Sequence, residues 1–351
     1  MPANVKLSRI CVFGAGAIGG HLAAKLAAAG HDVSVVARGA NLAALKANGV
    51  ALREGTQADA RTIAGRVRAS DRTSDLGAQD VVFVTTKATA LGAFADAAAP
   101  LIGGADTSFV FVQNGVPWWY SMGLDSETHR ARPRPPDLSR LDPAGALARA
   151  IAPQRVIGAV VYSSNDLAQP GVIVNYTSGR DMLVLGEIDD RASRRVCALR
   201  ELLTAAGMHS PHSGDIRQSV WDKLLLNFGS SLCVPLGEPV SALAANAALR
   251  EVRERIVGEG RAIAQAHGVS LEGVPKRPGG TGTAGAQTAG ATAHKPSMLQ
   301  DYEIGRPMEV DAILAVPCAF ARAAGVPAPT LEAVHALVAR LAARKGLYSS
   351  P

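Results

Sequence analysis

The segment RICVFGAGAIGG, residues 9–20, decides the fold, because its apolar run ends on glycines spaced G-x-G-x-x-G. Gly14 permits a tight turn from a strand into a helix, Gly16 lets the backbone approach a pyrophosphate, and Gly19 lets the helix pack closely on the strand. Unpaired amides at the start of the helix would face the anion. The predicted cofactor-binding residues of this turn are Gly14, Ala15, Gly16, Ala17, Ile18 and Gly19.

The flanking sequence supports a nucleotide site over a purely structural turn. Residues 17–29 place apolar side chains at helical spacing, and Gly30 follows them as a helix stop. Residues 32–37 then form an apolar run typical of a second strand. A strand, a glycine turn, an amphipathic helix and a second strand are the context that this fingerprint requires.

The end of the second predicted strand indicates which dinucleotide binds. An acidic residue there would bind a ribose 2′-hydroxyl and favour NAD, whereas an arginine can pair with a 2′-phosphate. This chain has Arg38 at that point and no carboxylate until Glu54. A guanidinium is a planar, permanently charged donor that suits phosphate. We therefore predict NADPH/NADP as the cofactor, with a solvated surface arginine as the alternative.

Length, charge and cysteine usage limit the classes of protein to which this chain can belong. The 351 residues exceed one ordinary domain, and a hydrophobic content of 48% suffices for two cores. The net charge of +6 comes from dispersed basic residues, which suits an anionic cofactor and substrate and disfavours nucleic acid as a partner. The four cysteines are far apart, without a C-x-x-C pair, so we expect no disulfide framework and no metal site.

The sequence also bears on location. It leads directly into the first predicted strand without a signal-peptide pattern, and it contains no charge-free apolar run of about 18 residues. We therefore expect a cytoplasmic protein that does not span a membrane.

Two further apolar runs, residues 81–86 and 108–112, flank an alanine-rich helical segment at 89–99. Runs of this kind indicate parallel strands that are buried on both faces. Ligands collect at the carboxyl ends of such strands. Lys87 and Asn114 follow the two runs and are therefore candidate binding residues, the alternative being solvated loop residues.

The remainder of the first domain carries no predicted chemistry. Residues 50–68 are expected to be irregular and partly extended, and the Arg- and Pro-rich residues 121–143 an exposed surface loop. Three short strands, at residues 156–162, 171–176 and 182–186, are expected to extend the first sheet. Helical periodicity then replaces the β-branched runs. We therefore predict an NADP-binding domain at 1–213 and a helical substrate domain at 214–351.

The second domain begins with a helix predicted over residues 216–232. Lys223 and Asn227 lie four residues apart on it, away from the apolar stripe, so both can act on one bound molecule. A surface lysine with a polar neighbour is the alternative. Farther along, residues 279–292 consist mainly of Gly, Thr and Ala and are expected to form a mobile loop that gates the site.

From end to end the chain resembles the ketopantoate reductase (2-dehydropantoate 2-reductase) family. The motifs that carry the resemblance are GAGAIG at 14–19, TK at 86–87, QNG at 113–115, WDKL at 221–224, SMLQD at 297–301 and EVD at 309–311. The resemblance implies an α/β fold, a Rossmann-type doubly wound parallel sheet followed by an all-helical C-terminal domain. It further implies NADPH-dependent reduction of a small-molecule 2-keto acid, most directly 2-dehydropantoate in pantothenate biosynthesis.

The resemblance also implies roles for individual residues. Lys223 would be the catalytic acid, and Glu309 would hold the substrate and tune the lysine. The implied substrate-binding residues are Asn114, Asn227, Ser231 and Ser297, and the implied cofactor-binding residues outside the glycine turn are Arg38, Lys87, Asn114 and Glu309.

Two departures from the family pattern bear on the substrate. Ser231 stands where the family commonly has a second asparagine, one helical turn after Asn227, and Trp118 and Trp119 could either crowd the pocket or pack the loop. A related oxidoreductase acting on a different 2-keto or hydroxy acid is therefore an open alternative, as is a non-catalytic NADPH-binding sensor. The sensor is disfavoured because it needs no acid beside the nicotinamide. The sequence does not fix the oligomeric state, and a homodimer is compatible with it.

Overall fold

The structure is a computed structural model, and it describes residues 7–55, 60–104, 106–125, 129–272, 274–276, 278 and 295–349. Its contacts divide the chain into two compact units. The first comprises Met1–Gln113 and Gly145–Ile216 with Arg277–Gly279, and the second comprises Asn114–Ala144, Arg217–Lys276 and Gly280–Pro351. The loop expected at residues 279–292 lies outside the described residues.

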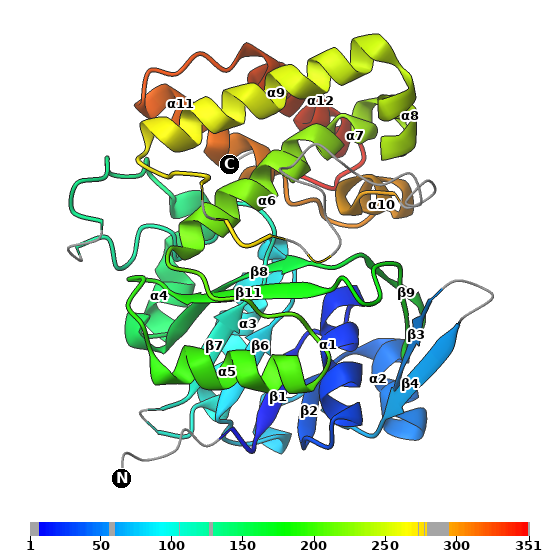
Figure 1. The fold of residues 1–351 in the computed structure, drawn as a ribbon. Helices are drawn as coiled ribbons and strands as arrows, with labels where there is room; N and C mark the ends of the chain where they lie inside the picture. Colours follow the sequence, from blue (N-terminus) through cyan, green and yellow to red (C-terminus); the bar gives the residue numbers. More distant parts are fainter. Residues whose placement is uncertain are drawn as a thin grey trace. The chain divides into compact units, whose positions relative to one another are not determined.

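The first unit is built on a seven-stranded sheet with the order β11-β8-β7-β6-β1-β2-β5 (Figure 1). Its strands are β1 (Ile10–Phe13), β2 (Val33–Val36), β5 (Arg68–Ser70), β6 (Val81–Val84), β7 (Ser108–Phe111), β8 (Val156–Tyr162) and β11 (Met182–Glu187). All neighbouring strands pair in parallel except β11, which is antiparallel to β8. Every residue of β1, β2, β6 and β7 is buried, as expected for parallel strands covered on both faces. The predicted Rossmann-type sheet is confirmed.

A second sheet of four strands corrects two predictions from sequence. Its order is β4-β3-β10-β9, with β3 (Val50–Glu54), β4 (Arg61–Gly65), β9 (Asn165–Gln169) and β10 (Val172–Asn175). The first half of this sheet lies in the segment that we expected to be irregular, and β10 does not extend the first sheet. The pairing that creates the sheet joins β3 to β10 across more than a hundred residues, so no local pattern announces it.

The helices of the first unit alternate with strands along the chain. They are α1 (Ala17–Ala28), α2 (Gly39–Asn48), α3 (Leu91–Ala97), α4 (Ala146–Ala150) and α5 (Arg194–Ala205), and α4 is the one that the sequence did not predict. Helix α1 contacts β1 and β2 of the first sheet and all four strands of the second. It is therefore buried on two faces, which explains why its residues from Gly19 to Leu26 are all inaccessible.

The second unit is helical, which confirms the predicted fold class. Its helices are α6 (Ile216–Ser231), α7 (Cys233–Leu236), α8 (Val240–Ala245), α9 (Ala247–Ala266), α10 (Ser297–Ile304), the π-helical turn η7 (Asp311–Ala315), α11 (Val316–Ala323) and α12 (Pro329–Arg344). A Cβ atom at Gly260 of α9 would lie 2.7 Å from side-chain atoms of both Leu225 and Phe228 on α6. The missing side chain therefore lets the two helices approach closely. Within the described chain, no helix combines the length and the apolar character that a membrane span requires.

Residues 114–144 belong to the second unit, which differs from the division expected at residue 213. Arg217, at the start of α6, is 1% exposed and donates to the backbone oxygen of Tyr120 at 2.9 Å. The indole Nε1 of Trp221 donates to the Tyr120 hydroxyl at 2.7 Å. Leu138 and Leu141 are buried, but most of the described residues of 121–143 are exposed or half-buried and lie outside helices and strands, so the predicted surface loop is largely confirmed. The contacts of Tyr120 with Arg217 and Trp221 join positions about a hundred residues apart, so no local pattern predicts them.

Candidate active site

The glycine turn has the geometry that its sequence predicts. Gly14 has φ +105°, a left-handed conformation that side chains rarely adopt, and its Cβ would lie 2.7 Å from Cγ2 of Thr86. A Cβ on Gly19 would overlap the carbonyl oxygen of Gly14 and the hydroxyl of Thr85. Both positions therefore require glycine, the first for the turn and the second for the packing of α1 on the sheet.

The start of α1 is open in a way that suits a phosphate group. Gly16 is the N-cap of the helix, and a Cβ there would meet no atom of the described residues within 4 Å. Among the described residues, no side chain caps this helix end and no acidic residue lies in its first turn. The free amides and the helix dipole are therefore available to an anion, and the residues present fit a dinucleotide.

Asn41 supports this turn, and sequence reasoning missed it. Its Nδ2 donates to the carbonyl of Ala15 at 2.7 Å, and its Oδ1 accepts from the amide of Gly171 at 2.8 Å. One side chain thus holds the glycine turn and the second sheet together. The only sequence signal was a polar residue on α2 beside the predicted turn.

Arg38 and Lys87 lie at the same edge of the sheet as the glycine turn. Arg38 follows β2, Lys87 follows β6, and β2 and β6 are the two parallel neighbours of β1. Parallel strands end at a common edge, so both cations are placed where ligands of this fold bind. Arg38 is exposed, and Lys87 is partly buried at the N-terminus of the 3₁₀ turn Ala88–Ala90.

In the second unit, one face of α6 carries three of the predicted polar residues. Lys223 and Asn227 are partly buried, and Ser231 is 1% exposed. The Nδ2 atom of Asn227 is buried and has no hydrogen-bond partner among the described residues. A buried amide donor without a partner costs about 1–3 kcal/mol, so a ligand that accepts from it would recover that energy.

Ser231 uses its hydroxyl within the helix. Its Oγ donates to the backbone carbonyl of Asn227 at 2.7 Å, a bond that serine commonly makes one turn back along a helix. The hydroxyl proton is therefore occupied, and only the oxygen lone pairs remain for a substrate. Ser231 is a weaker substitute for an asparagine than its polarity suggests.

Glu309 and Ser297 complete the predicted set in this unit. Glu309 is 4% exposed and directly precedes the helical residues that lead into η7. Ser297 is the exposed first residue of α10. The second unit thus contains Asn114, Lys223, Asn227, Ser231, Ser297 and Glu309, whereas the first unit contains the glycine turn, Arg38 and Lys87.

The two tryptophans after Asn114 are buried. Trp118 is 4% exposed and Trp119 is fully buried, with the guanidinium of Arg217 5.6 Å from its ring centroid. This environment favours the packing interpretation over a role in shaping the pocket.

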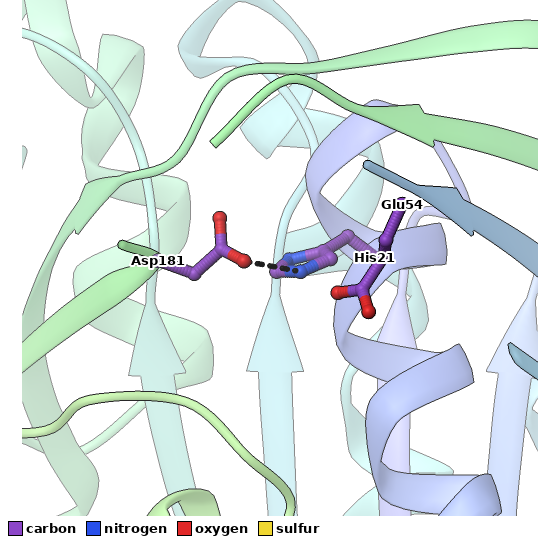
Figure 2. Close-up of side chains that lie close together, drawn as sticks. All are labelled: His21, Glu54 and Asp181. Carbon is purple, nitrogen blue, oxygen red and sulfur yellow. Dashed lines mark ion pairs between the residues drawn. The ribbon is translucent and has the colours of Figure 1, made fainter. Parts of the chain in front are cut away.

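A buried ionic cluster in the first unit was not foreseen from the sequence. His21, Glu54 and Asp181 place nitrogen and oxygen atoms within 4.8 Å of one another, a spacing that resembles a metal site (Figure 2). The Lys25 ammonium, however, lies 2.6 Å from Oε1 of Glu54, and Arg61 lies 2.7 Å from Oε2. These two cations already neutralise the glutamate, so we interpret the cluster as a structural ion network.

Asp181 is the second anion of this cluster. Its Oδ1 accepts three hydrogen bonds, from Ser163 at 2.6 Å and from Asn175 and Thr177 at 2.8 Å each. Burial by itself raises the pKa of Asp181, but the hydrogen bond and charge of His21, 3.5 Å away, and the bonds from Ser163 and Asn175 lower that pKa to about 2. The carboxylate therefore stays ionised and joins α1 to the entrance of β11.

Comparison with known proteins agrees with this architecture. The family model "Ketopantoate reductase PanE/ApbA" matches residues 10–130, and its C-terminal counterpart matches residues 215–342. A 2-dehydropantoate 2-reductase from Mesorhizobium japonicum is 42% identical over 344 residues, which is 97% of this chain and 100% of that protein.

Solved structures extend the comparison to the fold. A protein from Ralstonia solanacearum assigned as a ketopantoate reductase is 35% identical, with a TM-score of 0.80 over 98% of this chain and 100% of that one. D-mandelate dehydrogenase, solved with NADH and anilino(oxo)acetate, shares the fold at 17% identity and a TM-score of 0.75, over 97% and 99% of the two chains. Given both family models and the full-length relative, this chain belongs to the ketopantoate reductase family of pyridine-nucleotide-dependent oxidoreductases.

Proposed function

We propose that this protein catalyses the NADPH-dependent reduction of a 2-keto acid, with 2-dehydropantoate (ketopantoate) as substrate and pantoate as product, a reaction of pantothenate biosynthesis. The observation that carries the proposal is the polar face of α6. Lys223 and Asn227 lie there one turn apart, and the buried amide of Asn227 lacks a partner. The unpaired amide is a donor that a bound keto acid can engage one turn from the proposed proton donor, which supports a substrate site on this face.

The chemistry assigns each side chain a task. The reduced nicotinamide, when bound, supplies a hydride to the carbonyl carbon of the substrate. Lys223 delivers a proton to the carbonyl oxygen, where negative charge develops. Asn227 and Asn114 donate hydrogen bonds that orient the keto acid, and Glu309 positions the substrate and the lysine. General acid catalysis of this kind typically contributes about 10²- to 10⁴-fold.

The proposed preference for NADPH rests on Arg38. Within the described chain, this exposed guanidinium takes part in no hydrogen bond or ion pair and is available to a 2′-phosphate. Such charge-assisted bonds contribute roughly 1.5–3 kcal/mol, or about ten- to a hundredfold in efficiency. Arg38→Ala should narrow the ratio of kcat/KM for NADPH over NADH by that factor, and Arg53→Ala, an exposed arginine on β3, should not change it. An unchanged ratio in Arg38→Ala would exclude Arg38 as the phosphate ligand.

The decisive experiment is the oxidation of NADPH in the presence of a panel of 2-keto acids that includes ketopantoate. We expect ketopantoate to have the highest kcat/KM. Higher efficiency with another keto or hydroxy acid would support a related oxidoreductase, a second candidate that the engaged hydroxyl of Ser231 favours. NADPH binding without turnover of any member would support a sensor. The proposed homodimer is tested on the same preparation by light scattering.

A further inference from the structure

The helix that follows Glu309 contains a turn of π-helix, and Pro317 explains why one carbonyl of this turn has no amide partner within the helix. In η7 the amide of Val316 donates to the carbonyl of Asp311, five residues back. At the same spacing the carbonyl of Ala312 would need the amide of Pro317, which proline lacks. The amide of Val316 is thus engaged by Asp311, and Pro317 has no amide. Neither residue can therefore bond the carbonyl of Ala312 from within the helix.

The segment after Asn114 takes up this carbonyl. The backbone amide of Val116 donates to the carbonyl oxygen of Ala312 at 2.8 Å. Because a buried carbonyl without a partner is costly, the bond satisfies the helix and anchors the segment at once. Ala312 lies three residues after Glu309, and Val116 lies two residues after Asn114.

Gly115 is what lets the two backbones meet. It has φ +84°, and a Cβ atom there would lie 2.5 Å from both the carbonyl carbon and the carbonyl oxygen of Ala312. Backbone atoms cannot move aside as a flexible side chain can, so the position admits no larger residue. The glycine of the QNG motif is therefore required for a close approach between main chains, as well as for its turn.

A second tie joins the same two segments. Asp311, the first residue of η7, accepts from Nη1 of Arg140 at 3.1 Å and from the hydroxyl of Tyr348 at 2.8 Å. Arg140 belongs to residues 114–144, so this segment is held to the π-helical turn at two points.

We propose that Gly115, Ala312 and Pro317 form a backbone clasp, a positioning device that fixes Asn114 relative to Glu309. The clasp rests on the proposed function, because it acts through two residues of the proposed substrate site. π-Helical turns are frequent at functional sites, where they re-aim nearby groups. Here the turn leaves the carbonyl of Ala312 without a helical partner, and the bond that this carbonyl accepts fixes the position of the loop that bears Asn114.

The principal test is Gly115→Ala, with Gly325→Ala as a matched control. Gly325 lies in the same unit with φ +65°, but a Cβ there meets no atom within 4 Å in the part of the chain that the structure describes, so the control carries the backbone strain without the contact. After correction for folded fraction by circular dichroism, Gly115→Ala should lower kcat about 10- to 100-fold and raise KM for the keto acid. Gly325→Ala should stay within about twofold of wild type in both. Equal effects of the two variants would overturn the clasp, as would a fall in apparent kcat at unchanged KM.

Pro317→Ala tests the device without a clash and decides the question if Gly115→Ala does not fold. The new amide competes for the carbonyl of Ala312, so hydrogen exchange at the Val116 amide should accelerate about tenfold, and kcat should fall several-fold. The melting temperature should stay near that of wild type, because alanine is a better helix former than proline. Unchanged exchange at Val116 would refute the clasp. If the wild-type protein turns over no keto acid, the proposed function fails, and the exchange at Val116 alone decides the clasp.

Discussion

Helices α1 and α6 both bury polar side chains, but they treat them differently. On α1, Lys25 is paired with Glu54 at 2.6 Å, and His21 lies 3.5 Å from Asp181, so the buried charges are balanced inside the protein. On α6, the amide of Asn227 is buried with no partner in the described chain. Burial and polarity alone would therefore mark both helices as candidate sites.

The difference lies in charge, because the buried ions at α1 are paired with opposite charges, whereas the buried amide of Asn227 is a neutral donor without a partner among the described residues. In the α1 cluster, His21 Nδ1 and Asp181 Oδ2 also lack a hydrogen-bond partner among the described residues, but the charges are paired, and removing one member leaves a buried charge uncompensated. A buried donor without a partner costs about 1–3 kcal/mol, which a ligand that accepts from it would recover. We therefore expect substitutions on α1 to lower stability and substitutions on α6 to lower turnover.

The largest effect is expected from Lys223→Ala. Loss of the proposed proton donor should reduce kcat by at least about a hundredfold, whereas the melting temperature and the dissociation constant for NADPH should stay close to wild type. Steady-state kinetics and a thermal melt on the same preparation provide the measurement. Near-normal turnover on the best substrate would remove Lys223 from the mechanism and break the contrast between the two helices.

Lys25→Met tests helix α1, where we expect a loss of stability at unchanged turnover, the reverse of the result expected for Lys223→Ala. The substitution removes one of the two cations that pair with the buried carboxylate of Glu54 and leaves Arg61 as its partner. Because the remaining charge is then poorly compensated, the free energy of unfolding should fall by about 3 kcal/mol. The kcat of the folded fraction should not change. Lys46→Met, an exposed lysine on α2, serves as the control and should be neutral. A large loss of kcat in Lys25→Met with unchanged stability would mean that the α1 cluster takes part in function.

Asp181 gives the α1 cluster a pH dependence. The folded pKa of about 2 lies below the ordinary 3.8. The contribution of the ionised carboxylate to the free energy of unfolding is therefore complete above about pH 5 and is lost as the pH falls toward 2. The shift corresponds to about 2 kcal/mol. Asp181→Asn should therefore be less stable than wild type at pH 7 by about this amount, and urea unfolding curves should converge near pH 2. Asp71→Asn, at an exposed position, is the control. A constant difference at all pH values would argue against the ionised carboxylate as the cause.

The smallest effect concerns the α6 side of the comparison. Because the hydroxyl of Ser231 donates to the Asn227 backbone, the site has one polar partner fewer for a hydroxylated substrate. Ketopantoate should exceed 2-keto-3,3-dimethylbutanoate, which lacks the 4-hydroxyl, by only about tenfold in kcat/KM, against roughly 10⁴-fold for a dedicated hydroxyl site. A ratio above about a thousand would show that another group binds that hydroxyl.

The sequence by itself determined the elements whose signals are local. The glycine turn, the buried strands β1, β2, β6 and β7, and the helix that bears Lys223 all follow from glycine spacing and hydrophobic period within short windows. Lys87 and Asn114 were expected from strand ends, and Lys223 and Asn227 from helical spacing. The roles of Ser231, Ser297 and Glu309 were implied only by the family resemblance. The fold class and the family followed from these features together.

Only the tertiary structure decided what depends on distant partners. The second sheet needs β3 beside β10, and the charge of Lys25 becomes structural only because Glu54 reaches it from β3. Likewise, the carbonyl of Ala312 is free to accept from Val116 because Pro317, five residues later, has no amide to donate. Gly115 is the residue that allows the two backbones to approach. A periodic pattern records which face of an element is buried, but not which group it is buried against. Pairing of charges and of backbone groups is therefore decided by the assembled fold.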